Sequence, residues 1–292
     1  MKQIYLFIFL LPLFAKSQGP SPDFIRKMIA GQIASLKIMP EPIFKVEDRT
    51  VIAESDSIKI RLYYPSADKK QRIIFNIHGG ALVAGDLQTH DNISRVVANK
   101  CSAIVIALDY RKPPEAPYPA GLDDCEKVLS WIRKHAETIG GDSSDIIFLG
   151  DSGGGLFAFS LQIRLQNRFV PKAIVAVNPA VDLRTSDNPM YKLVAGWYLN
   201  GKSAADSIIS PVLATSVAFF PPTLIITSEK DELKAQAVVF KDKLAASGVS
   251  ANWVDLKGLD HLGALWAGPH PVAQQAVDET VRFINSIPKK RT

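Results

Sequence analysis

A serine with the surroundings of a nucleophile lies in the turn Gly150-Asp151-Ser152-Gly153-Gly154-Gly155. The turn follows the apolar run Ile146–Leu149 and opens a helical pattern that begins at Leu156. A serine on such a sharp strand-to-helix turn projects free of the sheet, and only glycine-sized neighbours let the two backbones approach so closely. The helix N-terminus adds backbone N–H groups and a partial positive charge at the same point. We therefore predict that Ser152 is a nucleophile.

Two other interpretations of this turn stay open. Glycine-rich turns between a strand and a helix also bind phosphate groups. However, the turn lacks the Gly-Lys-Ser/Thr ending of a P-loop and the spacing of a dinucleotide fingerprint. The remaining alternative is a turn with a purely structural role.

A second glycine turn, His78-Gly79-Gly80-Ala81, directly follows the apolar run Ile73–Ile77. Glycines leave their backbone N–H groups unobstructed, so two of these groups and the N–H of Gly153 would stabilise the oxyanion of a tetrahedral intermediate. A tight turn that needs glycine only for its backbone angles is the alternative. The pairing with the serine turn favours an oxyanion hole formed by Gly79, Gly80 and Gly153.

A serine is a poor nucleophile near neutral pH unless a base takes its proton, and histidine is the expected base. The histidines are His78, His90, His135, His261 and His270. His261 lies in the loop after the last strand-like run, where the carboxyl edge of the sheet returns to the serine, so we predict that it is the base. His270, which stands between two prolines ahead of the last helical pattern, is the alternative.

The acid that orients this base is predicted at Asp231, in the loop after the strand-like run Thr223–Thr227. A carboxylate there would hold the tautomer of the histidine and stabilise the imidazolium. Glu229, Glu232 and Asp260 compete for this role, and a solvated loop charge is the alternative for each of them. The chain order serine, aspartate, histidine favours Asp231.

The segments that must position these residues alternate between apolar runs and helical patterns. Six continuous apolar runs are typical of strands buried on both faces, and they span residues 73–77, 103–108, 146–149, 173–177, 223–227 and 252–256. Apolar spacing of three and four residues predicts helices at residues 91–100, 121–136, 152–166, 233–247 and 272–287. Two earlier runs of alternating residues, 44–53 and 58–64, predict an antiparallel hairpin. The pattern predicts a mostly parallel, eight-stranded sheet with helices on both faces.

The domain organisation that we predict is a single α/β domain over residues 18–292. Residues 183–221 show no clear strand, and residues 22–37 have a helix-like pattern. We expect elements within residues 18–42 and 184–220 to cover the carboxyl edge of the sheet as a small, reduced cap.

Composition excludes several classes of protein. The chain has 292 residues, of which 47% are hydrophobic and 22% charged, so disorder and a small disulfide scaffold are both excluded. The net charge is +5 with scattered Lys and Arg, and no nucleic-acid partner is expected. No metal or cofactor is expected either, because no His/Cys cluster occurs. Export would permit a disulfide, but we predict that Cys101 and Cys125 are two separate buried thiols.

Residues 1–17 have the pattern of a secretory signal peptide: a positive charge at Lys2, the apolar run Ile4–Ala15, and the small residues around Lys16. This run is too short to span hydrocarbon about 30 Å thick. We therefore expect an exported protein, periplasmic or secreted, without stable membrane insertion. A retained N-terminal anchor is the alternative.

The two glycine motifs resemble those of the hormone-sensitive-lipase-like family of α/β-hydrolases, which includes bacterial carboxylesterases. Further matches are Gly85–Leu87, Asp109–Arg111, Pro114-Glu115, Pro119-Ala120, Asp123–Cys125 and Asn178–Leu183. The resemblance implies the α/β-hydrolase fold, with Ser152 as nucleophile, Asp231 as acid and His261 as base. It also implies that the N–H groups of Gly79, Gly80 and Gly153 are the oxyanion donors.

The sequence also departs from this family. Ala81 stands where a third glycine is usual, and Gly153 where alanine is common. Residues 184–210 are shorter than the usual insert, which carries an aromatic-rich helix. This shortness suggests a reduced cap and a more open acyl pocket.

The resemblance implies a serine carboxylesterase that hydrolyses short- to medium-chain or aromatic carboxylic esters through an acyl-enzyme. Its partner would be a small-molecule ester, and the protein would be a monomer or a homodimer. One alternative is an amidase or peptidase, although the chain has no room for the added propeller domain that a peptidase often carries. The other is a non-catalytic, ligand-binding homologue, which a hydrolysis assay distinguishes.

Overall fold

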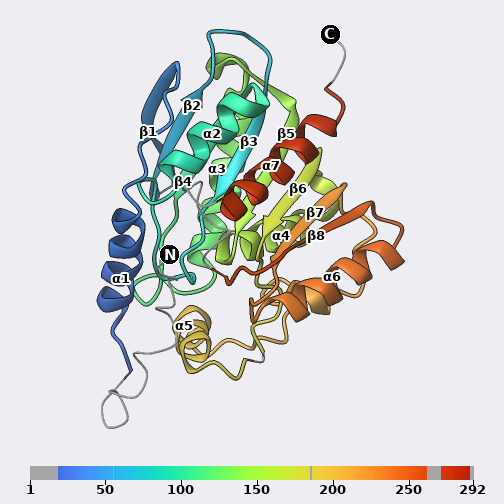
Figure 1. Ribbon diagram of the computed structural model, residues 1–292. Coiled ribbons are helices and arrows are strands. Elements are labelled where there is room, and N and C mark those ends of the chain that lie inside the picture. Colours follow the sequence, from blue (N-terminus) through green and yellow to red (C-terminus); the bar gives the residue numbers. More distant parts are fainter. Residues whose placement is uncertain (1–18, 55, 185, 262–270, 290–292) are drawn as a thin grey trace.

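The central feature of the fold is one sheet covered by helices on both faces (Figure 1). The computed structural model describes residues 19–54, 56–184, 186–261 and 271–289. Within these residues the sheet has eight strands in the order β1-β2-β4-β3-β5-β6-β7-β8. The strands are β1 (Lys45–Ala53), β2 (Asp56–Tyr64), β3 (Gln71–Ile77), β4 (Ala103–Asp109), β5 (Gly141–Asp151), β6 (Ala173–Val177), β7 (Thr223–Ser228) and β8 (Ala251–Leu256).

The pairing of these strands confirms the predicted sheet. β1 and β2 form the antiparallel hairpin, with Val51 opposite Ile58, and β2 is also antiparallel to β4. Every other neighbouring pair is parallel. The sheet is therefore mostly parallel, as its continuous apolar runs predicted.

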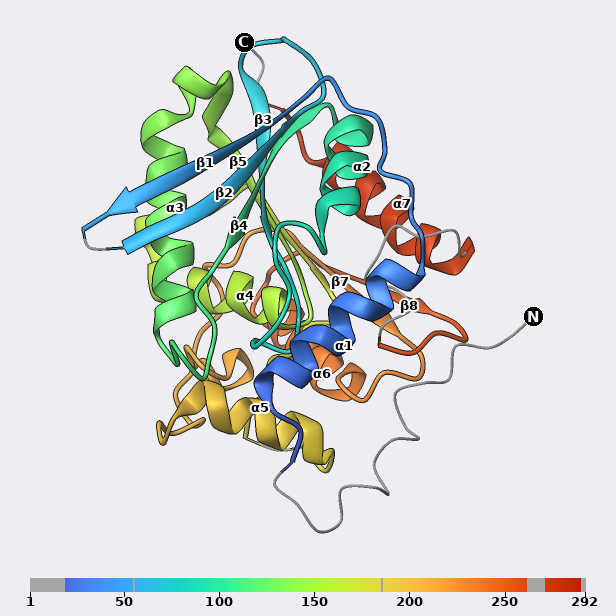
Figure 2. The ribbon, with the colours of Figure 1, turned by 90° about the vertical axis from the view of Figure 1, so that its left-hand side faces the viewer.

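Helices cover the two faces of the sheet. They are α1 (Pro22–Ser35), α2 (Asp91–Cys101), α3 (Ala120–His135), α4 (Gly153–Leu165), α5 (Pro189–Leu199), α6 (Lys234–Ala246) and α7 (Pro271–Ser286), with short 3₁₀ turns at Glu137–Ile139, Gln166–Arg168 and Pro211–Leu213. Helices α2 and α7 lie side by side on one face (Figures 1 and 2). Helices α3, α4 and α6 pack in the hydrophobic cluster of the other face.

Strand β3 shows why the central runs lack polar alternation. All seven of its residues are buried. Ile73, Phe75 and Ile77 point into the cluster that holds α3, α4 and α6, whereas Ile74 points into the cluster with α2 and α7. Successive side chains leave opposite faces of a strand, so a strand covered on both faces needs apolar residues at every position.

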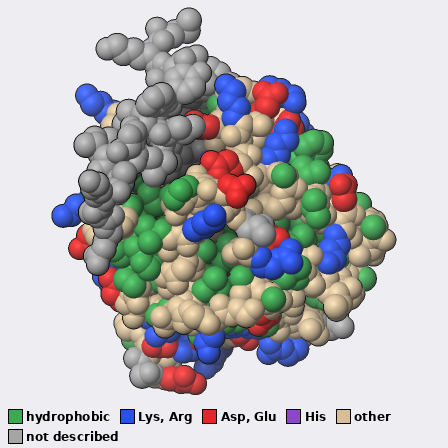
Figure 3. All heavy atoms as spheres, turned by 90° about the horizontal axis from the view of Figure 1, so that it is seen from below, with side chains coloured by type: hydrophobic (Ala, Val, Ile, Leu, Met, Phe, Trp, Pro, Cys, Tyr) green, Lys and Arg blue, Asp and Glu red, His purple; other side chains and the backbone are tan. Residues whose placement is uncertain are grey.

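The carboxyl ends of the parallel strands point to the lower end of the molecule in Figure 1, where α1 and α5 also lie. These two helices share one small hydrophobic cluster with the turn after β3, formed by Ile25, Ile29, Val83, Ala84 and Val194. Seen from this end, exposed hydrophobic side chains lie among basic ones (Figure 3). The segments predicted to form the cap, about 18–42 and 184–220, contain α1 and α5 respectively.

Helix α5 lies in the second segment. Residues 184–210 are shorter than the family's usual insert, which carries an aromatic-rich helix. The segment nevertheless forms eleven residues of helix, α5, with Tyr191, Trp197 and Tyr198 on it. Its N-cap is Asn188, whose side chain accepts a hydrogen bond from the N–H of Met190 at 2.8 Å.

Three further predictions concern the whole chain. Cys101 and Cys125 are free and buried, as predicted. Within the described residues, every helix is too short or too polar to cross a membrane. The predicted signal peptide, residues 1–17, lies outside the described residues.

Candidate active site

Ser152 lies on a sharp turn between the end of β5 and the start of α4. Its backbone has φ 50° and ψ −115°, a conformation that non-glycine residues adopt only where the surrounding structure enforces it. A Cβ at Gly154 would stand 1.9 Å from the carbonyl oxygen of Ile77, and a Cβ at Gly150 would stand 2.4 Å from that of Gly154. Gly150 and Gly154 are therefore required by backbone contact, as the sequence predicted.

The structure brings the three predicted residues into one hydrogen-bonded chain. His261 Nε2 lies 2.9 Å from Ser152 Oγ, and His261 Nδ1 lies 2.9 Å from Asp231 Oδ2. The carboxylate of Asp231 is fully buried, while the imidazole side chain is 17% exposed. The other oxygen of Asp231 accepts the N–H of Leu233 at 2.9 Å, which fixes the carboxylate in the loop after β7.

The competing residues lie elsewhere. Glu229 accepts the N–H of Gly258, and Glu232 accepts an N–H from the side chain of Asn188 at 3.0 Å. His135 stacks on Trp131 at the end of α3. The fallback base His270 lies outside the described residues.

The environment of His261 favours its protonated form. Burial alone would lower the pKa of the imidazole, but the hydrogen bond and charge of Asp231 outweigh it, with help from the charges of Asp151 and Asp260. The net result is a pKa raised above the ordinary value of 6.5. A nearby carboxylate is thus arranged to stabilise positive charge on this ring.

In the turn after β3, one of the three predicted oxyanion donors is not available. The N–H of Gly79 donates to Asp151 Oδ1 at 3.0 Å, so it is already engaged. The prediction for Gly79 therefore does not fit this geometry. Within the described part of the chain, the N–H groups of Gly80, Ala81 and Gly153 have no such acceptor. The N–H of Gly153 is unpaired because it opens α4.

Asp151 and His90 are polar neighbours of the serine that sequence reasoning did not connect. His90, the N-cap of α2, lies with its Nε2 3.2 Å from Asp151 Oδ1. The carboxylate thus joins the serine turn to the turn at Gly79 and to α2. Asp151 is part of the serine motif, but its partner His90 lies 61 residues away in the chain, and no local pattern predicts that contact.

The cap helix α5 reaches the same site. The ring of Tyr191 lies edge-on to the imidazole of His261, with 6.3 Å between ring centres. The pKa of the Tyr191 hydroxyl is raised by burial and by the nearby charges of Asp231 and Glu232. An aromatic side chain of the cap helix therefore lies beside the histidine.

The described residues contain no group of three or more His, Cys, Asp or Glu side chains able to hold a metal ion. This arrangement allows His261 to accept a proton from the hydroxyl of Ser152, which lies at the N-terminus of α4. Such a constellation suits attack on an electrophilic carbon.

Comparison with known proteins then assigns the fold. A family model for the alpha/beta hydrolase fold matches residues 74–264, which include Ser152, Asp231 and His261. This chain belongs to the α/β-hydrolases. A carboxylesterase of Mycobacterium tuberculosis is 31% identical over 242 residues, covering 75% of this chain and 76% of the relative. An arylesterase of Saccharolobus solfataricus is 28% identical over 234 residues, with 75% and 76% covered.

Hormone-sensitive lipase of Bos taurus is 31% identical over 135 residues, which cover 46% of this chain and 18% of the lipase. Among solved structures, the esterase of Pyrobaculum calidifontis superposes with a TM-score of 0.84 at 29% identity, covering 91% of this chain and 94% of that one. The resemblance to hormone-sensitive-lipase-like α/β-hydrolases is thereby confirmed, as is the fold.

Proposed function

We propose that this α/β-hydrolase is a serine carboxylesterase that acts on short- to medium-chain or aromatic carboxylic esters. The observation that carries the proposal is the unbroken hydrogen-bonded chain from Ser152 through His261 to Asp231. Hydroxyl, imidazole and carboxylate in this order are the constellation of serine acyl-transfer enzymes on several unrelated folds.

The reaction begins as Ser152 Oγ attacks the ester carbonyl carbon while His261 Nε2 takes the hydroxyl proton. The tetrahedral intermediate collapses by breaking the bond to the alkoxy oxygen, which leaves as the alcohol with the proton from Nε2. Water then attacks the acyl-enzyme, again losing its proton to His261, and the carboxylic acid leaves as Ser152 recovers its hydrogen. Asp231 stabilises the imidazolium in both halves of the reaction.

The oxyanion would be stabilised by the N–H groups of Gly80, Ala81 and Gly153. Ala81 takes the place of Gly79 in the predicted set because the N–H of Gly79 already donates to Asp151. Removal of one such donor typically slows an enzyme by about 100- to 1000-fold. The bond from Gly79 to Asp151 instead fixes the turn that carries two of these donors.

The substrate class is supported by two observations. The similar proteins of known name are a carboxylesterase and an arylesterase. In addition, Tyr191 presents an aromatic edge beside His261, which suits an acyl or aryl group of moderate size. The signal-like pattern of residues 1–17 leads us to propose a periplasmic or secreted location.

The test is a panel of p-nitrophenyl esters from acetyl to palmitoyl, hydrolysed by the wild-type protein and by Ser152→Ala. We expect the highest kcat/KM for the shorter esters, and a loss of kcat of roughly four to six orders of magnitude in the variant. An active Ser152→Ala variant would refute the mechanism. A wild-type protein inactive on every ester would instead favour a ligand-binding homologue.

A further inference from the structure

The turn after β6 begins at Asn178, a residue that the mechanism above does not use. Asn178 is fully buried, and its backbone has φ 46°, in the left-handed region that asparagine tolerates better than most residues. Its own N–H donates to the carbonyl oxygen of Ile226 at 2.7 Å. The backbone of this residue is thus fixed at the carboxyl ends of β6 and β7.

The side chain of Asn178 makes three hydrogen bonds. Its Oδ1 accepts the N–H of Ser228 at 2.8 Å, and its Nδ2 donates to Ser228 Oγ at 3.0 Å and to the carbonyl oxygen of His261 at 2.9 Å. An amide has one carbonyl oxygen and two N–H donors, so every polar group of this buried side chain has a partner. In the described part of the chain, no other hydrogen bond reaches the main chain of His261.

Asn178 and its direct neighbours contact all three loops of the proposed site, those of Ser152, Asp231 and His261. Ser228 accepts the N–H of Asp231 at 3.1 Å through its carbonyl oxygen, so the Asn178 amide holds the loop of the acid. Next to Asn178 in the chain, the carbonyl oxygen of Val177 accepts the N–H of Ser152 at 2.8 Å. The serine loop, the acid loop and the base loop therefore meet around one residue.

We propose that Asn178 is a positioning residue that fixes the relative placement of the Ser152, Asp231 and His261 loops. The inference rests on the proposed serine mechanism. The two imidazole nitrogens lie 2.9 Å from Ser152 Oγ and 2.9 Å from Asp231 Oδ2, so a shift of the His261 backbone disturbs both contacts. Loss of about 1 Å in such an alignment can cost about 100-fold in rate.

The decisive variant is Asn178→Gly, which removes the three side-chain bonds but keeps a residue that adopts positive φ freely. With p-nitrophenyl acetate we expect kcat to fall about 10- to 100-fold while KM changes little. The rising limb of kcat/KM against pH should also move to lower pH, because an imidazole held less closely to Asp231 has a lower pKa. A merely structural role would not move this limb.

The second variant is Asn178→Asp, which has the same shape and decides the question if the glycine variant does not fold. It keeps the acceptor for the N–H of Ser228 but places a carboxylate oxygen against the carbonyl oxygen of His261. We expect a similar loss of kcat with an unchanged far-UV circular dichroism spectrum.

The matched control is Asn76→Ala. Asn76 is another buried asparagine near a strand end, and its Nδ2 donates to Ser94 Oγ at 3.0 Å, a bond that involves none of the three loops. We expect it to keep the wild-type pH profile and a kcat near the wild-type value. Folded Asn178 variants with wild-type kcat, a loss confined to KM, or an equal loss in Asn76→Ala would overturn the inference.

The outcomes separate the two proposals. An active Ser152→Ala variant refutes the serine mechanism itself. An inactive Ser152→Ala variant together with fully active Asn178 variants refutes only the positioning role.

Discussion

His261 is the residue on which the proposed chemistry turns, because it must be neutral to accept a proton and positive to stabilise the intermediate. Its raised pKa means that more of the resting protein carries an imidazolium near pH 6.5 than an isolated histidine would. We therefore expect kcat/KM to rise with pH through a midpoint above 6.5, where the imidazolium loses its proton.

Asp231→Asn tests this cause directly. The hydrogen bond and the charge of Asp231 are the two largest influences that raise the pKa of His261, so weakening them should move the midpoint to lower pH. The wrong tautomer would also be favoured, and kcat should fall by about 10⁴. The measurement is kcat/KM from pH 4 to 10, roughly the window in which histidine titrates.

Asp260→Asn is the control for this prediction, because the charge of Asp260 raises the pKa of His261 less than Asp231 does. It should shift the midpoint in the same direction by less and leave kcat close to the wild-type value. If it abolished activity while Asp231→Asn did not, the acid would be misassigned.

For single residues, the sequence could predict those whose proposed role follows from residue type and local spacing. Ser152 was found from its glycines, and His261 and Asp231 from their places after strand-like runs. The oxyanion donors were partly misassigned, since whether the N–H of Gly79 is free depends on Asp151, 72 residues away. Asn178 matched the family motif, but its three partners come from long-range contacts that no spacing reveals.

Among the elements, α1 is joined to the body of the protein by Arg26 as well as by its hydrophobic cluster. Its Nε donates to the carbonyl oxygen of Val83 at 2.9 Å, and its terminal nitrogens contact both carboxylate oxygens of Glu115 at 2.9 and 2.6 Å. The hydrogen bond from Arg26 holds the pKa of Glu115 at about 2, so the ion pair persists in mild acid. Val83 belongs to the turn that carries Gly80, which places α1 one contact away from the proposed oxyanion hole.

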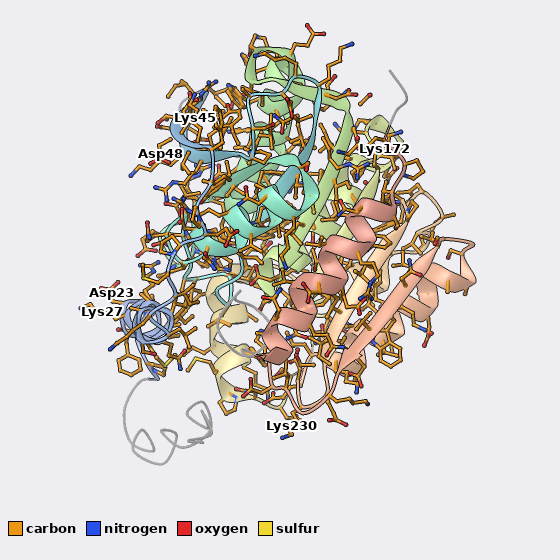
Figure 4. All side chains as sticks on the ribbon, turned by 45° about the horizontal axis from the view of Figure 1, so that its top comes forward. Asp23, Lys27, Lys45, Asp48, Lys172 and Lys230 are labelled. Carbon is orange, nitrogen blue, oxygen red and sulfur yellow. The ribbon has the colours of Figure 1, made fainter. Side chains whose placement is uncertain are left out.

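Arg26→Met should therefore loosen α1. We expect limited proteolysis within residues 22–35 to be about ten times faster, because local opening then costs less free energy. The value of kcat/KM should fall by a few-fold as the turn at Val83 loses its partner. Lys27→Met is the matched control, since Lys27 is an exposed neighbour on the same helix (Figure 4), and it should change neither measurement. Equal cleavage of the two variants would contradict this role of Arg26.

The elements of the sheet were predictable for a physical reason that does not extend to α5. A strand covered on both faces must be apolar almost throughout. The continuous apolar runs of β3, β4 and β6 therefore predicted these strands. Helix α5 is apolar around much of its surface, with Lys192 as its only charged residue, so it has no clear polar face to mark it.

For the whole molecule, the buried side chain of Arg72 connects the sheet to the last helix. Its Nε donates to Asp145 Oδ1 at 2.9 Å, and its terminal nitrogens donate to the carbonyl oxygens of Ile284 and Ile287 at 2.6 and 2.8 Å. These carbonyls lie at and just beyond the end of α7, where a positive charge is favourable. The contacts fix α7 at the opposite end of the sheet from Ser152.

Arg72→Met should lower the free energy of unfolding by about 3–5 kcal/mol, because it leaves the carboxylate of Asp145 buried without its partner. Urea denaturation measures the change. The double variant Arg72→Met/Asp145→Leu should recover part of the loss, and kcat of the folded protein should stay unchanged in both. A double variant less stable than the single one would show that the charge of Asp145 is not the cause.

The attachment of α1 also bears on how this catalyst should be fixed to a solid support. A bead or electrode coupled through the amino-terminal helix would transmit strain by way of Arg26 to the loop above the nucleophile. The carboxyl-terminal helix is held by Arg72 at the end of the sheet opposite Ser152, so a linker placed there would leave turnover undisturbed.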